Sequence, residues 1–218
     1  MLILLLSACD PGPGDGPFAL AYAGGDDCVS ADVADVDPPD ALTVELWMRG
    51  DPGTSPTPHL RPFVHWGGVF GLGEDEAENA FFWAGAEPGA STVSSLMDGI
   101  LHHVAGTWDG NTVTLFVDGE KQAFADGVPA TAPTSKLRIG CDGDAHAYDG
   151  LLDEVRVSSV VRYDDDFDLP TGAYAVDDDT IALFHFEEGE GEETVDAVDG
   201  RVASVYGPDW VAFSLGSE

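Results

Sequence analysis

The stretch NTVTLFVDGE, residues 111–120, constrains the fold more than any other part of the sequence. Val113, Leu115 and Val117 recur at every second position and alternate with residues that belong to the opposite side. A period of two residues is the spacing of a β-strand, because successive side chains of a strand point to opposite faces. The stretch therefore predicts a strand with two distinct faces.

Turn residues flank this strand on both sides. Asp109, Gly110 and Asn111 precede it, and Asp118 and Gly119 follow it. These residue types tolerate a positive φ, which tight hairpin turns require. Together with the preceding HHVAGTW, the segment predicts three antiparallel strands in a meander.

The same alternation recurs along the chain, and no apolar pattern at helical spacing is long enough to predict a helix. Further strands are expected at residues 42–49, 136–140, 151–160 and 180–187, with Gly, Pro and Asp clusters between them. Strands of this number in 218 residues must stack as two sheets or close into a barrel, which hides their apolar faces and edges. The fold class is therefore predicted to be all-β.

The first seventeen residues differ from the rest. Residues 1–9, MLILLLSAC, resemble the signal and lipobox of bacterial lipoproteins, in which cleavage before the cysteine leaves it acylated. This resemblance implies lipidation at Cys9, export and membrane anchoring in the bacterial cell envelope; the alternative is a chance cysteine in an unstructured start. Because no Lys or Arg precedes the apolar run, we expect the native start to lie upstream. Residues 10–17 read as a linker, and residues 18–215 as one globular domain.

Cysteine counting supports an exported protein. If Cys9 carries lipid, Cys28 and Cys141 remain as an even pair. We predict a disulfide between them. Two buried free thiols are the alternative, and the spacing matches no zinc motif.

The charge is strongly negative, with 41 Asp and Glu against 8 Lys and Arg, a net charge of −33. Such a surface repels phosphate, which argues against nucleic acid as a partner and leaves the lipid anchor as the expected contact with a membrane. Cations are the natural counter-partners. The charge can also serve as a solvated shell in a salty medium.

Five segments, in order, resemble the laminin-G-like, concanavalin A-like jelly-roll family: FALAYAGGDDCV, LTVELWMR, HHVAGTWDGNTVTLFVDGE, LRIGCDG with YDGLLDEVRV, and ALFHFEEGEGEETVDAVDG. The resemblance implies a two-sheet antiparallel jelly-roll sandwich. It does not specify a ligand, because this sandwich carries sugar-binding, protein-binding and purely structural roles.

The sequence gives little evidence for catalytic residues. Glu74, Glu76 and Glu78 alternate as in retaining β-glucanases, but no apolar residue anchors them and GEDEAEN reads as a solvated loop. The second alternating set, formed by Glu188, Glu190 and Glu192, contains glycines that indicate a turn. We therefore expect a protein that is not an enzyme.

The histidine pair and its neighbouring tryptophan are expected to be structural. His102 and His103 are adjacent, so on a strand they point to opposite faces and cannot share one metal ion. Packing and hydrogen bonding are the expected roles, and Trp108 is expected in the core.

Calcium is the candidate cofactor. In calcium-binding members of the family the ligands come from loops near the opening and closing strands, which implies Asp26, Asp27, Asp142 and Asp144 as metal ligands, with Asp153 as an outside candidate. Asp153 and Glu154 can equally be structural, bonding backbone groups at the start of a strand.

These patterns favour a non-catalytic recognition module outside the cytoplasm that binds a carbohydrate or glycoprotein, with calcium as a possible requirement. The alternative is a structural or adhesion protein of the cell envelope without a small ligand. An aromatic platform on one sheet face would favour sugar binding, whereas smooth polar faces would favour the alternative.

Overall fold

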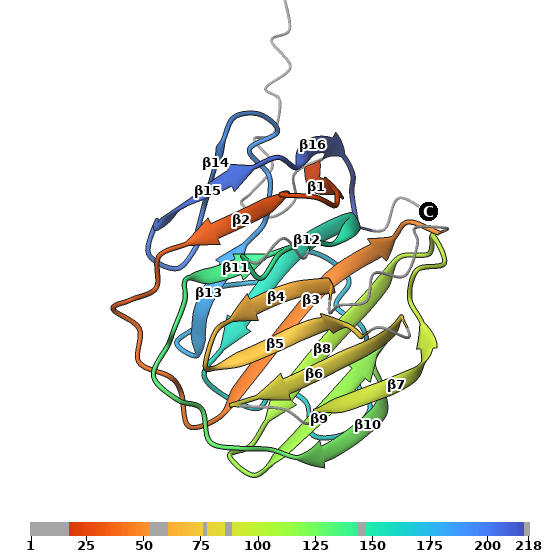
Figure 1. Cartoon of the computed structure of the whole chain (residues 1–218), viewed down its shortest axis with the longest axis vertical. Helices are drawn as coiled ribbons and strands as arrows, with labels where there is room; N and C mark the ends of the chain where they lie inside the picture. Colours follow the sequence, from red (N-terminus) through yellow and green to blue (C-terminus); the bar gives the residue numbers. More distant parts are fainter. Residues whose placement is uncertain (1–17, 53–60, 76–77, 86–88, 144–146, 216–218) are drawn as a thin grey trace, which may run out of the picture.

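The computed structural model describes residues 18–52, 61–75, 78–85, 89–143 and 147–215. Two antiparallel sheets of eight strands each stack face to face, and no helix occurs among these residues (Figure 1). The predicted all-β, two-sheet sandwich is confirmed.

The rear sheet lies behind in Figure 1 and has the strand order β10-β9-β8-β3-β12-β1-β16, with β13 also paired to β12. Its strands are β10 (Glu120–Asp126), β9 (Thr112–Val117), β8 (His102–Trp108), β3 (Leu42–Gly50), β12 (Asp149–Ser158), β1 (Phe18–Ala23), β16 (Asp209–Ala212) and β13 (Thr180–Phe184).

The front sheet has the order β14-β15-β2-β11-β4-β5-β6-β7. Its strands are β14 (Glu193–Val195), β15 (Val202–Tyr206), β2 (Cys28–Ala31), β11 (Leu137–Ile139), β4 (Arg61–Trp66), β5 (Phe70–Glu74), β6 (Asn79–Ala84) and β7 (Ala90–Ser95).

One continuous apolar core fills the space between the sheets. Every second residue of each long strand enters it, as the alternation in β9 predicts, and Val113 and Leu115 are fully buried there. Phe82 of β6 faces Gly106 of β8 across the core. A side-chain carbon at Gly106 would lie 2.4 Å from the Phe82 ring, so only glycine fits.

The predicted meander is present. Gly110 lies between β8 and β9 with a φ of 94°, and the Asp109 carboxylate accepts the backbone N–H groups of Asn111 and Thr112 at 2.9 and 2.7 Å. Asp118, with a φ of 52°, and the following glycine join β9 to β10. The turn residues that the sequence analysis predicted therefore form both hairpin turns.

The predicted disulfide is also present. Cys28 at the start of β2 is bonded to Cys141 just after β11, across 113 residues of sequence. The two strands are neighbours, with Val29 opposite Ile139. In the chain-entropy model, closing a loop of this length stabilises the fold by about 4–5 kcal/mol.

A long connection, residues 159–179, lies across the outer face of the rear sheet; we call it the strap. The hydroxyl of Thr43 in β3 donates to the carbonyl of Val160 at 2.7 Å and accepts the backbone N–H of Arg162 at 2.9 Å. Farther along, the N–H of Phe167 donates to the carbonyl of Gly119. The strap explains why β3 is buried on both faces rather than on one.

None of the described segments forms a helix long and apolar enough to cross a membrane. Cys9, the lipobox and the linker at residues 10–17 lie outside the described residues.

Candidate functional site

The outer face of the front sheet carries a continuous row of residues in register. Pairing across successive strands sets Ser30 opposite Arg138, Arg138 opposite His65, His65 opposite Gly71, and Gly71 opposite Trp83. The flanking residues of each strand enter the core, so the members of this row point outward. We call these five positions the front row.

Trp83 forms the aromatic end of the front row. A side-chain carbon at Gly71 would lie 2.6 Å from the Trp83 indole nitrogen, so the indole lies across β5 at the position where that strand has no side chain. The next outward pair on these two strands sets Phe81 opposite Gly73. Both aromatic side chains are half-buried. Glycine at position 71 therefore lets the Trp83 indole of β6 lie across the neighbouring strand.

The middle of the front row supplies polar groups beside the indole. The rings of His65 and Trp83 meet edge to face, with centroids 5.9 Å apart. The Arg138 guanidinium donates to the backbone carbonyl of Asp142 at 2.6 Å and lies against the turn at Gly143, which has a φ of 96°. This contact fixes the guanidinium on the sheet face.

The chemistry of the front row suits a ligand that has both an apolar ring face and hydrogen-bonding edges. An indole offers a flat apolar surface, while a guanidinium offers several N–H donors in a fixed plane. Binding at such a face needs no reacting group. The arrangement can bind such a ligand through stacking and hydrogen bonds alone.

Three of the four aspartates predicted as calcium ligands are described. Asp27 accepts the backbone N–H of Ala23 at 2.7 Å and so shapes the turn after β1, where Asp26 also lies. Asp142 follows the disulfide, and Asp144 lies outside the described residues. No cluster of three or more His, Cys, Asp or Glu side chains suited to a metal occurs among the residues that the structure describes. Calcium binding stays a prediction.

Asp153, the outside candidate, is buried with only 3% of its surface exposed. Burial raises its pKa to about 8, and the neighbouring Glu154 carboxylate contributes. Asp153 accepts the backbone N–H of Glu154, and Glu154 accepts that of Tyr174 in the strap at 2.8 Å. Both carboxylates bond backbone groups, as in the structural alternative, but they do so at a bulge inside β12, where Glu154 has a φ of 51°, and not at a strand start.

The prediction of a solvated loop for GEDEAEN is wrong at its first acidic residue. Glu74 is the last residue of β5 and is fully buried, 3.6 Å from the Arg61 guanidinium. Burial raises the pKa of Glu74 to about 8. The strand continues to this point because Arg61 pairs directly opposite Glu74 on β4. Glu78 lies in the turn that follows, with a φ of 63°, and Glu76 is outside the described residues.

The histidine pair has the hydrogen-bonding roles expected of it. The ring of His102 bonds the Asp118 carboxylate at 2.7 Å, which raises the pKa of His102. His103 is fully buried under the strap, with its Nε2 2.8 Å from the Tyr174 hydroxyl and 3.3 Å from a carboxylate oxygen of Glu45. Trp108 is in the core, as expected.

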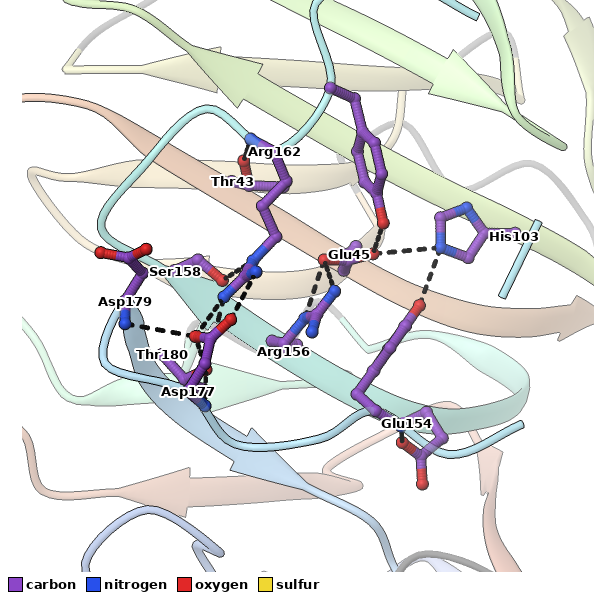
Figure 2. A network of polar contacts seen from close by, with 12 residues as sticks. Thr43, Glu45, His103, Glu154, Arg156, Ser158, Arg162, Asp177, Asp179 and Thr180 are labelled. Atoms are coloured by element: carbon purple, nitrogen blue, oxygen red, sulfur yellow. Dashed lines mark hydrogen bonds and ion pairs between the residues drawn. The ribbon is translucent and has the colours of Figure 1, made fainter. Parts of the chain in front are cut away.

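Glu45 of β3 is the centre of this buried network (Figure 2). The Arg156 guanidinium donates to one of its oxygens at 2.9 and 2.7 Å, and the Tyr163 hydroxyl donates to the other at 2.8 Å. Burial would raise the pKa of Glu45, but the hydrogen bond with His103 and the charge of Arg156 outweigh it and lower the pKa. The network joins the strap to the sheet.

Sequence reasoning missed the front row, because β4, β5 and β6, which carry His65, Gly71 and Trp83, were not predicted. NAFFWA, residues 79–84, has consecutive aromatic residues and no period of two. The available signal was FGLG, residues 70–73, in which large apolar residues alternate with glycine. Glycine within a strand marks a close approach by another group, here the Trp83 indole.

A model of the concanavalin A-like lectin/glucanases superfamily matches residues 23–166, more than half of the chain. The chain belongs to this superfamily. The match includes β2 to β12, and therefore all five positions of the front row. No curated protein sequence matches significantly.

Solved structures agree on the fold at low sequence identity. A provisionally assigned carbohydrate-binding protein from Bacteroides ovatus is 19% identical, with a TM-score of 0.74 over 91% of this chain and 60% of the other, so this chain spans about three fifths of that protein. CBM40 of the Ruminococcus gnavus IT-sialidase, bound to α2,3-sialyllactose, is 14% identical, with a TM-score of 0.53 over 67% of this chain and 91% of the other. Mouse laminin α1 domains LG4-5 are 15% identical, with a TM-score of 0.53 over 74% and 48%.

Proposed function

We propose that this protein is a non-catalytic carbohydrate-recognition module that binds glycans on the outer face of its front sheet. The observation that carries the proposal is the Trp83 indole lying over Gly71, in register with His65 and Arg138. Sugar rings have an apolar face that stacks on aromatic side chains, and their hydroxyls match guanidinium and imidazole groups. The structural likeness to CBM40 and to the Bacteroides ovatus protein supports the same role.

The placement of the perturbed acids supports a role without catalysis. The carboxyl groups whose pKa is raised to about 8, Glu74 and Asp153, are buried in the interior and are not members of the front row. A general acid must reach the substrate within hydrogen-bonding distance. These two groups are therefore assigned to the fold.

A glycan microarray tests the proposal, with the full chain probed in the presence and absence of calcium. We expect binding to a defined set of glycans, lost in Trp83→Ala and partly kept in Trp83→Phe, which retains an aromatic face. Tyr206→Ala is the matched control, because Tyr206 is 68% exposed on β15 of the same sheet, outside the front row. Absence of binding to every glycan would instead support a structural or adhesion protein.

We propose the cell envelope as the place of action, with Cys9 as the lipidated anchor. The motif Leu6-Ser7-Ala8-Cys9 supports it. Expressed with its native upstream start, the protein should partition into detergent, and Cys9→Ser should shift it to the aqueous phase. Retention of the variant in the detergent phase would contradict the anchor.

A further inference from the structure

A cavity of about 260 Å³ opens on the opposite side of the molecule, on the outer face of the rear sheet beside the strap. Strands β8, β9 and β10 form its floor, and the start of the strap forms one wall. It is lined by Thr107, Asp109, Thr112, Thr114, Lys121, Phe124, Val161, Tyr163 and Asp164. We call it the rear pocket.

Threonine hydroxyls and one exposed ring dominate the floor of the rear pocket. Thr107 pairs with Thr114, and Thr114 pairs with Phe124, so the three form one outward row across the strands. Phe124 is 75% exposed, the largest value among the exposed apolar side chains of the described chain. Its ring lines the rear pocket and is open to solvent, so a ligand in the pocket can stack on it.

The same hydroxyl row continues under the strap, where it is occupied. Thr43 of β3 pairs with Thr107 and with Ser158 of β12. There the Arg162 guanidinium donates to the Ser158 hydroxyl at 2.7 Å, and its backbone N–H donates to Thr43. In the rear pocket the hydroxyls of Thr107, Thr112 and Thr114 form no side-chain hydrogen bond to any described residue. The row therefore offers donors and acceptors to a ligand where the strap ends.

The wall of the rear pocket is rigid. Tyr163 stacks on Phe167 with ring centroids 3.6 Å apart, and its hydroxyl is held by Glu45. Lys121 donates to the backbone carbonyl of Asp164 at 2.5 Å and lies 3.8 Å from the Asp165 carboxylate. Because this ammonium is already paired, and because Asp109 and Asp164 border the cavity, an anionic ligand would be repelled. A preformed wall lowers the ordering cost of binding.

We propose that the rear pocket is a second sugar subsite that takes one neutral hexopyranose unit. The ring stacks on Phe124, and its hydroxyls bond the half-buried Thr112 and Thr114, while Thr107, only 3% exposed, lines the floor beneath them. A cavity of about 150 Å³ holds a benzene molecule, so the rear pocket has room for one six-membered ring with its substituents. With the front row on the other sheet, the protein would contact glycan on both faces and could join two chains.

Methyl NMR on the full chain tests this proposal. The probes are methyl glucoside, methyl galactoside and methyl mannoside, with the methyl glycoside of glucuronic acid as the anionic counterpart. We expect at least one neutral glycoside to shift the methyl signals of Thr107, Thr112 and Thr114 saturably in the millimolar range, and the glucuronide to bind more weakly. Phe124→Ala should weaken that binding about tenfold or more, because the sugar loses the aromatic face on which it stacks.

The controls separate this proposal from the front-sheet site. Trp83→Ala should leave the threonine shifts unchanged, and the indole N–H signal of Trp83 should report front-sheet binding in the same titrations. The rear pocket is overturned if no neutral glycoside shifts the threonine methyls, if Phe124→Ala leaves the affinity unchanged, or if the glucuronide binds as tightly. Movement of the Trp83 signal alone would overturn the rear pocket and leave the front-sheet proposal standing.

Discussion

Glu45 is a fully buried charge whose partners come from strands and from the strap. Arg156 and Tyr163 occupy its two oxygens, and His103 lies 3.3 Å from the second. A buried ion pair contributes little net stability against an apolar replacement, but removing one partner leaves the other charge uncompensated. The network therefore sets the position of the strap on the sheet, in addition to the attraction between its charges.

Glu45→Gln is therefore predicted to destabilise the protein by about 3–5 kcal/mol, because Arg156 would remain buried without its counter-charge. Denaturant unfolding measures the change. Glu193→Gln, at an exposed position in β14, is the matched control and should alter stability little. Equal effects of the two substitutions would show that Glu45 is not a buried charge.

We predict that Asp153 makes the free energy of unfolding depend on pH with the opposite sign from that of a salt-bridged acid. Burial raises its pKa in the folded protein to about 8, above the unfolded value near 4, so the folded state holds the proton more tightly. The stability that Asp153 contributes to the folded protein is fully present below about pH 4 and is lost as the pH rises toward 8. Asp153→Asn should remove this loss, so the variant gains relative to the native protein by on the order of 1.4 kcal/mol per pH unit across that window. Urea unfolding at pH 4 to 9 tests it, and a constant difference would contradict it.

At the scale of elements, the strap covers the central strands of the rear sheet, so that β3, β8 and β12 are buried on both faces. The Asp177 carboxylate accepts both ends of the Arg162 guanidinium at 2.9 and 2.7 Å, which ties the two ends of the strap together. This bidentate pair lowers the pKa of Asp177. The strap also supplies the wall of the rear pocket.

Arg162→Lys should loosen the strap, because an ammonium keeps the charge but cannot make two parallel bonds to one carboxylate. Hydrogen exchange is the measurement. The amide of Phe167, which donates to the Gly119 carbonyl, should exchange faster, while amides in the β3 to β8 pairing should not change. Arg201→Lys is the control, because Arg201 is similarly buried and pairs with Asp199 and Asp196, outside the strap. Unchanged exchange at Phe167 would show that the Arg162–Asp177 pair does not hold the strap in place.

The sequence was most informative where one face of a strand is apolar and the other polar. The hairpins around Thr112–Val117 and the disulfide followed from alternation, turn residues and cysteine counting. The front-sheet strands Arg61–Trp66 to Ala90–Ser95 were not predicted, because aromatic residues occupy both faces and glycines interrupt the pattern. The burial of Glu74 depends on Arg61 opposite it, and that pairing is set only by the folded register. The front row arises in the same way, from five strands that only the sheet order brings together.

For the whole molecule, the charge of −33 on 218 residues sets the behaviour in salt. Self-repulsion of the acidic surface destabilises the compact state, and ions screen it over about 8–10 Å at 0.1–0.15 M ionic strength. Neutral ligands are favoured over anions for the same reason. Both proposed sugar sites fit this constraint.

Thermal melts in sodium chloride, with calcium titrated from zero, test the proposed calcium site. Added sodium should raise the melting temperature by screening alone. If Asp26, Asp27, Asp142 and Asp144 bind calcium, a further increment should appear in excess sodium and saturate as RT ln(1 + [L]/Kd). Asp26→Asn combined with Asp27→Asn should abolish that increment. Its persistence in the double variant, or the lack of any saturable increment, would eliminate this site and leave the fold assignment intact.

The most direct measurement of the central claim is calorimetric titration of an array-selected oligosaccharide into the native protein, Trp83→Ala and Tyr206→Ala. We predict that Trp83→Ala weakens binding about tenfold or more, since the loss of a large aromatic contact costs about 1.5–3 kcal/mol, while Tyr206→Ala binds like the native protein. Equal melting temperatures would confirm that all three are folded. Native affinity in folded Trp83→Ala would contradict the claim that the front sheet binds glycan through its indole.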